Sequence, residues 1–315
     1  LTESAITRDS SELGRAKRVE SAQEDYQRFC LSTVPAELRL DKLKLVIDCS
    51  HGADFKVAPR VLSELGAEIV PIGCSPNGRN INDGCGSTDP ELLKLTVQGV
   101  RADVGVAFDG DGDRVLMVDR EGNLIDGDQL LYLLARARQE RGLLKGPVVG
   151  TLMSNLGLQR ALEEQGIPFK RAAVGDRYVL KMLREEGGEL GGETSGHVLC
   201  LDKTTTGDGL VAALQVLEVI VESGRTVAEL VAGMPRFPQT LINSRTARRV
   251  YVECSEPIRA AVAKAEGDLA ERGRVLVRAS GTEPVLRVMV EGENEQEVNS
   301  VARSLAEGIQ AATAA

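Results

Sequence analysis

The chain has 315 residues, of which 42% are hydrophobic and 27% charged, so it is long enough for two or three globular domains with apolar cores. Its formal net charge of −9 argues against a nucleic-acid surface, which would need clustered lysine and arginine. The six cysteines form no C-x-x-C pair, and no apolar run reaches the ~20 residues of a membrane span. These features predict a protein of the reducing cytoplasm.

The first hundred residues alternate between predicted helices and strands, as judged from hydrophobic periodicity. The expected elements are a helix at 16–30, a strand at 44–49, a helix at 54–65, a strand at 67–73 and a helix beginning near Pro90. We interpret residues 1–102 as a first α/β domain.

The alternation restarts at residue 103 and predicts a second α/β domain over 103–234. Its expected helices lie at 127–140, 155–165 and 177–186, with a fourth beginning near Asp208. Two prolines in "GMPRFPQ" then mark a boundary. The last 80 residues or so, 235–315, predict a small α+β domain with strands at 274–279 and 285–291 and helices at 257–272 and 295–311.

Three aspartates, Asp109, Asp111 and Asp113, stand between two apolar runs in "VGVAFDGDGDRVLMVD", separated only by glycines. Like charges this close repel unless a cation lies among them, and hard carboxylate oxygens suit Mg²⁺ or Ca²⁺. An EF-hand loop is excluded, because its sixth and twelfth positions are Arg114 and Arg120 rather than Gly and Glu. We favour Mg²⁺ with phosphate as a further ligand, and we expect Arg114 to hold a phosphoryl oxygen. The alternative is a simple polar turn between two strands.

The segment "GGETSGHVL" places Glu193, Ser195 and His197 at alternate positions, so an extended backbone would turn all three to one side. A carboxylate, a hydroxyl and an imidazole together suit sugar hydroxyls, and His197 is a candidate proton carrier. Ser195 does not fit the nucleophile elbow of a hydrolase, which needs glycine at position 193. The other histidine, His51, is interpreted as structural.

The segment "VLVRASGTEPVLRVMV" predicts two strands joined by a polar loop. Arg278, the hydroxyls of Ser280 and Thr282 and the backbone amide of Gly281 are the parts of a phosphate cradle. Arg287 alternates with apolar neighbours and is free to join the same anion. An ordinary hairpin with a surface arginine is the alternative.

A weaker signal is "VGDRYV", which contains Asp176 and Arg177. Asp176 either contacts substrate or only caps the helix that follows.

The loops "DGDGDR", "GETSGH" and "RASGTEP", in this order, resemble the alpha-D-phosphohexomutase superfamily, and the resemblance runs through the whole chain. It implies two α/β domains with mixed sheets followed by the small C-terminal domain. It also implies a reaction that passes phosphate between a phosphoserine and either end of a sugar, through a bisphosphate intermediate. The three aspartates would bind Mg²⁺ beside the phosphoserine, and Arg114 would lie near the transferring phosphoryl group.

The resemblance gives the remaining loops roles in substrate binding. Glu193 and Ser195 would hold sugar hydroxyls, while His197 would assist proton transfer. Asp176 and Arg177 would lie in another substrate-contacting loop. The phosphate that is not reacting would be held by Arg278, Ser280, Gly281, Thr282 and Arg287.

Within the superfamily, "SGTEPVLRVMVEG" and "VGDRYVLKML" are similar to the phosphoglucosamine mutase branch. This implies a phosphorylated amino sugar as substrate, with neither nucleic acid nor membrane as partner; a homodimer is one oligomeric state left open. A phosphomannomutase or phosphoglucomutase is the alternative.

The superfamily's phosphorylated serine lies in an N-terminal loop of the Thr/Ser-Ala-Ser-His-Asn-Pro type, which these 315 residues do not contain. Their only Ser-His pair, Ser50-His51, is followed by Gly-Ala. We therefore expect the chain to comprise the superfamily's second to fourth domains, beginning in the tail of the first, and to show no turnover alone. A non-catalytic homologue that binds a sugar phosphate is the other hypothesis.

Overall fold

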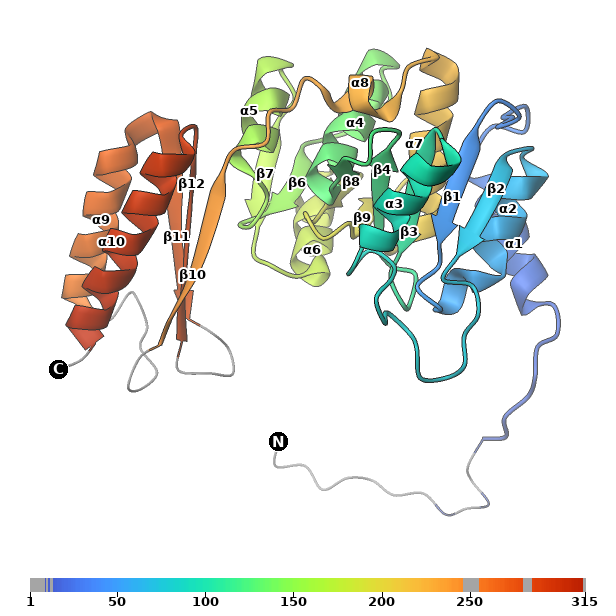
Figure 1. Cartoon of the computed structure of the whole chain (residues 1–315), viewed down its shortest axis with the longest axis horizontal. Coiled ribbons are helices and arrows are strands. Elements are labelled where there is room, and N and C mark those ends of the chain that lie inside the picture. The colour runs from blue at the N-terminus through green and yellow to red at the C-terminus, as the bar shows by residue number, and fades with distance from the viewer. Residues whose placement is uncertain (1–8, 10, 12–13, 246–254, 280–284, 314–315) are drawn as a thin grey trace.

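A computed structural model describes residues 9, 11, 14–245, 255–279 and 285–313 of the protein. Within these residues three β-sheets follow one another along the chain, each covered by helices (Figure 1). The first two sheets mix parallel and antiparallel strands, and the third is antiparallel. This confirms the predicted fold class, two α/β units followed by a small α+β domain.

The first sheet has the strand order β2-β1-β3-β4-β5. Strands β2, β1 and β3 are parallel, and β4 turns back antiparallel to β3. The strands are β1 (Lys44–Asp48), β2 (Glu68–Ile72), β3 (Val104–Phe108), β4 (Val115–Asp119) and β5 (Leu124–Ile125). The helices are α1 (Ala22–Ser32), α2 (Val57–Glu64) and α3 (Glu91–Val100), with a short 3₁₀ turn η2 (Ala53–Phe55) before α2.

The expected domain boundary after residue 102 is wrong, because it divides this sheet. Strand β3 hydrogen-bonds to β1 in parallel register, with Leu45 opposite Val104 and Asp48 opposite Ala107. All five residues of β3 are buried, so the strand completes the first core rather than beginning a second one. The second unit starts after β5.

The second sheet has the order β7-β6-β8-β9, in which β8 and β9 form an antiparallel hairpin. Helix α4 has the predicted bounds, because Asp126 and Gln129 form a capping box at its start. The strands are β6 (Val148–Thr151), β7 (Phe169–Ala172), β8 (Leu190–Gly192) and β9 (Val198–Cys200). The helices are α4 (Gly127–Glu140), α5 (Leu156–Glu164), α6 (Asp176–Glu186), α7 (Gly209–Ser223) and α8 (Val227–Val231).

Helix α7 joins the first two units, since it packs against β3 and β4 of the first sheet and β9 of the second. One continuous hydrophobic core therefore runs through both units. The two polar residues that interrupt its apolar sequence both have partners: Gln215 Nε2 donates to the Thr33 carbonyl oxygen at 3.2 Å, and Glu218 pairs with Arg141 at 2.8 Å. In the part of the chain that the structure describes, no helix combines the length and apolar character needed to cross a bilayer.

The C-terminal unit builds a core of its own beneath an antiparallel sheet of order β10-β12-β11. Helices α9 and α10 lie side by side against this sheet (Figure 1). Its elements are β10 (Gln239–Arg245), α9 (Glu256–Leu269), the 3₁₀ turn η4 (Ala270–Arg272), β11 (Gly273–Ala279), β12 (Val285–Gly292) and α10 (Glu295–Thr313).

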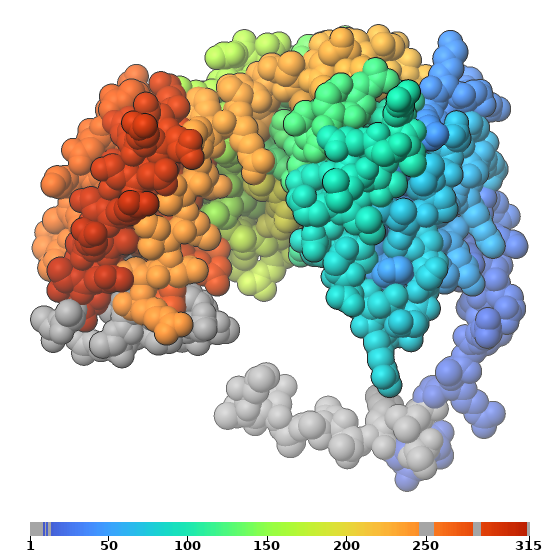
Figure 2. Space-filling view, viewed as in Figure 1, coloured from blue at the N-terminus to red at the C-terminus, as the bar shows by residue number. Residues whose placement is uncertain are grey.

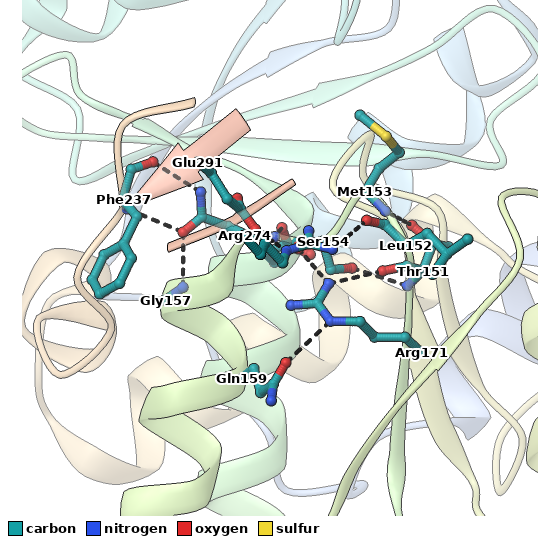
Figure 3. Close-up of polar contacts among 12 residues, drawn as sticks. Thr151, Leu152, Met153, Ser154, Gly157, Gln159, Arg171, Phe237, Arg274 and Glu291 are labelled. Carbon is teal, nitrogen blue, oxygen red and sulfur yellow. Dashed lines mark hydrogen bonds and ion pairs between the residues drawn. The ribbon is translucent and has the colours of Figure 1, made fainter. Parts of the chain in front are cut away.

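A cluster of polar contacts attaches the C-terminal unit to the second sheet (Figure 3). The Arg274 guanidinium donates to the Leu152 carbonyl oxygen at 2.9 Å and to that of Ser154 at 2.8 Å, and it pairs with the fully buried Glu291. Arg171 donates to the same Ser154 oxygen from the other side. The molecule is hollowed between this C-terminal unit and the projecting loop after β2 (Figure 2).

A candidate active site at the aspartate loop

The three aspartates connect β3 to β4, where buried strands hold both ends of the loop. One carboxylate oxygen from each of Asp109, Asp111 and Asp113 lies within 4.8 Å of the others. Asp109 is buried, Asp113 half-buried and Asp111 exposed, so the cluster opens to solvent on one side. Three hard oxygens with an open position form a site that a divalent cation fits.

The electrostatics of the loop also favour a cation. Burial, and then contact with Asp113, raise the pKa of Asp109 to about 6. Arg114 compensates only in part. Its backbone N–H donates to Asp109 Oδ1 at 3.1 Å, but its Nε lies 3.6 Å from Asp109 Oδ2 and 3.6 Å from Asp113 Oδ1. Asp113 Oδ1 is buried with no hydrogen-bond partner in the structure. A metal ion would supply the missing positive charge.

Glycines give the loop its shape. Gly112 has φ +78°, and a Cβ there would stand 2.5 Å from Asp54 Oδ2, so the position requires glycine. The Gly112 carbonyl oxygen accepts from the Gly209 N–H at the start of α7, at 2.8 Å, and the Gly110 oxygen accepts from the Ala53 N–H at 2.9 Å. Elements from both units therefore hold the loop in place.

Asp54 is a residue beside the site that the sequence analysis did not single out. Only 4% of the residue is exposed, and its Oδ2 has no hydrogen-bond partner. Burial, followed by the nearby charges of Asp208 and Asp109, raises its pKa to about 7. Its position in "HGADF" gives no sign of this, since the contact with Gly112 depends on tertiary structure.

Residues 193–197 form the tight turn of the β8–β9 hairpin, so the expected extended conformation with three side chains on one face is wrong. The Gly196 N–H donates to the Glu193 oxygen, and the Glu193 N–H donates to the His197 oxygen, both at 3.0 Å. Glu193 is half-buried, Ser195 exposed and His197 buried. The chain reverses direction here because β9 pairs back onto β8.

His197 instead contacts the aspartate loop. Its Nδ1 lies 3.0 Å from Asp113 Oδ2, and only 4% of the residue is exposed. Its Nε2 faces Gly207, where a Cβ would come within 2.2 Å, and has no partner. A second link joins the two loops, because the Val115 N–H donates to the Gly196 oxygen at 3.0 Å. The imidazole therefore positions one of the three candidate metal ligands.

The segment "VGDRYV", the weaker signal in the sequence, adjoins the same turn. The Gly175 N–H donates to Glu193 Oε1 at 3.0 Å, at the start of α6. Gly175 is the N-cap of α6, and Asp176 is the first helical residue. The alternative that Asp176 itself caps the helix is therefore wrong. The Arg177 guanidinium lies 4.5 Å from the centre of the Tyr178 ring and is exposed.

Arg278 and Arg287 lie directly opposite each other on β11 and β12. Their neighbours Leu286 and Val288 are buried in the C-terminal core, so Arg287 points to the other face, as predicted. Burial and the charge of Arg287 lower the pKa of Arg278. Neither guanidinium has a carboxylate partner among the described residues. The other three residues of the predicted cradle, Ser280, Gly281 and Thr282, lie outside the described residues.

A buried carboxylate, Asp128, supports the turn at residues 193–197 and was also missed by the sequence analysis. Asp128 Oδ2 accepts from the Thr194 hydroxyl and from the Asn155 N–H, both at 2.8 Å. Burial, and then the charge of Asp126, raise its pKa to about 6. The available signal was an acidic residue in the first turn of a predicted helix, which alone indicates only a favourable helix start.

Three family models match the chain in succession. They describe phosphoglucomutase/phosphomannomutase alpha/beta/alpha domain II at residues 24–122, alpha/beta/alpha domain III at 126–237 and the C-terminal domain at 241–308. These matches define the class: the chain is built from phosphohexomutase domains.

Curated relatives narrow this class. Phosphoglucosamine mutase from Aeromonas hydrophila is 55% identical over 304 residues, covering 96% of this chain and 68% of that protein. The enzyme of the same name from Nitrosococcus oceani is 54% identical over 303 residues, covering 96% of this chain and 67% of that protein. The chain therefore belongs to the phosphoglucosamine mutase family, and it spans about two thirds of the length of these relatives.

Solved structures show the same fold. A phosphoglucomutase/phosphomannomutase family protein from Burkholderia thailandensis has a TM-score of 0.76 at 26% identity, covering 92% of this chain and 64% of that one. N-acetylphosphoglucosamine mutase from Aspergillus fumigatus, crystallised with GlcNAc-6P and magnesium, has a TM-score of 0.76 at 21% identity, covering 93% and 66%.

Proposed function

We propose that the protein to which this chain belongs interconverts glucosamine 6-phosphate and glucosamine 1-phosphate, through a phosphoserine and a bisphosphate intermediate, for amino-sugar and cell-wall precursor synthesis in the cytoplasm. The observation that carries the proposal is the cluster of three carboxylates beside Arg114, in a chain 55% identical to phosphoglucosamine mutases. Cluster and arginine together supply the charges that phosphoryl transfer requires.

Asp109, Asp111 and Asp113 would hold Mg²⁺, which when bound offsets the charge on a transferring phosphoryl group. Arg114 is 43% exposed in its side chain and borders the cluster, so its guanidinium can donate to a phosphoryl oxygen. His197 fixes the orientation of Asp113 through the 3.0 Å contact. We retain it as the candidate for assisting proton transfer, with Asp113 as its observed partner.

The remaining loops would bind the substrate. Glu193 and the exposed Ser195 would contact sugar hydroxyls, with Asp176 and Arg177 at the neighbouring helix start. Arg278 and Arg287 would hold the phosphate that is not reacting, because two adjacent guanidinium groups without a carboxylate partner in the described chain repel each other until an anion binds. Ser280, Gly281 and Thr282 would complete that cradle.

A comparison of substrates tests the proposal. The full-length protein, with Mg²⁺, is assayed on glucosamine phosphates and on mannose and glucose phosphates at equal concentration. We expect the highest kcat/KM on glucosamine phosphates. A higher value on mannose or glucose phosphates would instead make the protein a phosphomannomutase or phosphoglucomutase.

The same assay on the 315-residue chain tests the expectation from its sequence. We propose that these residues alone bind the metal and sugar phosphate but give no turnover, because they contain no phosphoserine loop of the superfamily type. Turnover by the purified chain would contradict this proposal. Absence of turnover in the full-length protein as well, with sugar-phosphate binding retained, would support the non-catalytic homologue.

A further inference from the structure

Two cysteines follow the neighbouring parallel strands β1 and β2, next to residues 50–53, which contact the aspartate loop. Cys49 directly follows β1, and Cys74 follows β2 by two residues. The Cys49 N–H donates to the Ile72 carbonyl oxygen at 3.1 Å, and the Cys74 thiol donates to the same oxygen at 3.2 Å. The backbone of one cysteine and the sulfur of the other thus converge on one acceptor.

The two side chains lie on the same core, to which β1, β2 and the helices that cover them contribute. Cys49 is fully buried in the main core, while Cys74 packs against that core and is half-buried. The neighbouring Cys49 thiol lowers the pKa of Cys74, whereas the Cys74 thiol and burial raise the pKa of Cys49. The pair therefore combines a half-buried cysteine with a fully buried one, as an attacking and a resolving thiol would require.

The chain turns after β2 so that both cysteines lie on one face of the sheet. The parallel ladder pairs Asp48 with Ile72, which places Cys49 beside Gly73, and regular alternation would turn Cys74 to the opposite face. Gly73 has φ 62°, which ends this alternation, and Cys49 and Cys74 pack against the same hydrophobic core. Strands about 4.8 Å apart and a step of about 3.3 Å give a Cα separation of about 6 Å. This falls within the range of about 4.4–6.8 Å that disulfides span.

We propose that Cys49 and Cys74 form an oxidation site, at which a hydroperoxide converts the two thiols into an intramolecular disulfide. The Cys74 thiolate attacks a peroxide oxygen, the O–O bond breaks, and Cys74 becomes a sulfenic acid as the alkoxide or hydroxide leaves. The Cys49 sulfur then attacks the Cys74 sulfur, the S–O bond breaks, and water leaves. Overall, two thiols and one hydroperoxide yield one disulfide, one alcohol or water molecule, and one water molecule.

The site is connected to the aspartate loop through residues 50–53. Ser50 and His51 have φ values of 49° and 52°, which non-glycine residues adopt uncommonly, so this turn tolerates little displacement. The Ala53 N–H holds the Gly110 oxygen at 2.9 Å, between two of the three candidate ligands. Drawing Cys49 toward Cys74 is expected to displace this support and weaken cation binding. This consequence rests on the proposed metal site, whereas the oxidation site does not.

Tryptic mapping tests the oxidation site directly. Cleavage at Lys44, Lys56, Arg60 and Arg79 places Cys49 in peptide 45–56 and Cys74 in peptide 61–79. The purified chain is treated with hydrogen peroxide, alkylated with iodoacetamide after denaturation, and digested without reductant. We expect the two peptides to appear as one disulfide-linked species that dithiothreitol separates. Peptide 80–94, which carries the buried Cys85, should remain alkylated.

Variants define the pair. Cys74→Ser should abolish the linked species, whereas Cys85→Ser should leave its yield unchanged. With Cys49→Ala, dimedone should trap a sulfenic acid on Cys74 in the folded protein, whose fold is checked by circular dichroism. Linkage of either cysteine to a different partner, or formation of Cys74 sulfinic acid without any linked peptide in the unsubstituted chain, would overturn the proposal.

A titration then tests the coupling. Mg²⁺ affinity of the oxidised protein should fall about 10-fold relative to the reduced protein and recover with dithiothreitol. Equal affinity in both forms contradicts the coupling while the oxidation site stands. Absence of Mg²⁺ binding in the reduced form counts against the proposed metal site instead, so the two failures are distinguishable.

Discussion

The aspartate loop and the arginine pair both concentrate like charge, but the chain builds them in different ways. The three aspartates fall within five consecutive residues, and their carboxylates meet because glycines let the loop turn tightly. Arg278 and Arg287 are nine positions apart and meet through the register of β11 and β12. A loop can specify a local cluster by itself, whereas a cross-strand pair depends on the sheet that aligns it.

The two clusters also differ in how far nearby groups of opposite charge offset their own charge. The aspartate loop already contains Arg114 and is contacted by His197, yet it retains a buried oxygen without a partner. The arginine pair has no carboxylate partner in the described part of the chain. This uncompensated charge in the described residues is why we propose a cation for the aspartate loop and an anion for the arginine pair.

The largest expected effect comes from Asp111→Asn in the local cluster. This removes one of three anionic oxygens that would contact the ion. Loss of a residue that only supports a metal ligand costs up to about 100-fold in affinity, so we expect the Mg²⁺ affinity, measured by calorimetry, to fall by more than that. Asp111 is exposed, so the melting temperature without metal should not fall. The control is Asp268→Asn on α9, also exposed, which should bind Mg²⁺ normally. Equal affinities for the two variants would contradict the metal assignment.

Arg278→Gln tests the pair that the strands build. Loss of one charge-assisted hydrogen bond should lower affinity for a sugar phosphate by about 10-fold or more. Stability without ligand should stay the same or rise, because repulsion with Arg287 is relieved. Arg303→Gln, at an exposed position on α10, is the matched control. If both variants bind glucosamine 6-phosphate as tightly as the unsubstituted protein, the pair is a surface feature of an ordinary hairpin.

Gly52→Ala asks how far the aspartate loop depends on its neighbours. A Cβ at this position would stand 2.2 Å from the Gly110 oxygen, so the backbone must shift. We expect a loss of about 1–3 kcal/mol in unfolding free energy, measured by urea denaturation, together with weaker Mg²⁺ binding. Gly99→Ala on α3, where a Cβ meets nothing within 4 Å, should stabilise slightly. An aspartate loop independent of tertiary support would bind Mg²⁺ equally in both variants.

The smallest effect concerns the pH dependence of stability and Asp128, the buried carboxylate that supports the turn at residues 193–197. The pKa of Asp128 is raised to about 6, above the ~3.9 of an unfolded aspartate. A raised pKa means that the folded state binds this proton more tightly, so its stabilisation is complete below about pH 4 and lost as pH rises through about 6. Between about pH 4 and pH 6, the unfolding free energy of Asp128→Asn, measured by urea denaturation, should therefore fall less than that of the unsubstituted chain. The control, Asp268→Asn, should follow the unsubstituted chain. Parallel curves for Asp128→Asn and the unsubstituted chain would contradict the assigned shift.

The sequence predicted most elements because helix and strand periodicity is a local property. The bounds of α4 coincide with the prediction, since a capping box fixes its first turn. The short helix α8 was missed, although Thr226 and Glu229 form its capping box, because five residues carry too little periodicity. The domain boundary at residue 102 was wrong, since nothing local in β3 specifies which strand it pairs with.

By itself, the sequence determined the order of the elements, the three polar loops and the candidate oxygen ligands in the aspartate loop. Each of these depends on neighbours within a few positions. The tertiary structure decided that β3 completes the first sheet, that His197 reaches Asp113 across 84 positions, and that Cys49 and Cys74 pack against the same core. Strand pairing and core packing bring such residues together, and both are settled by the whole chain rather than by any one segment.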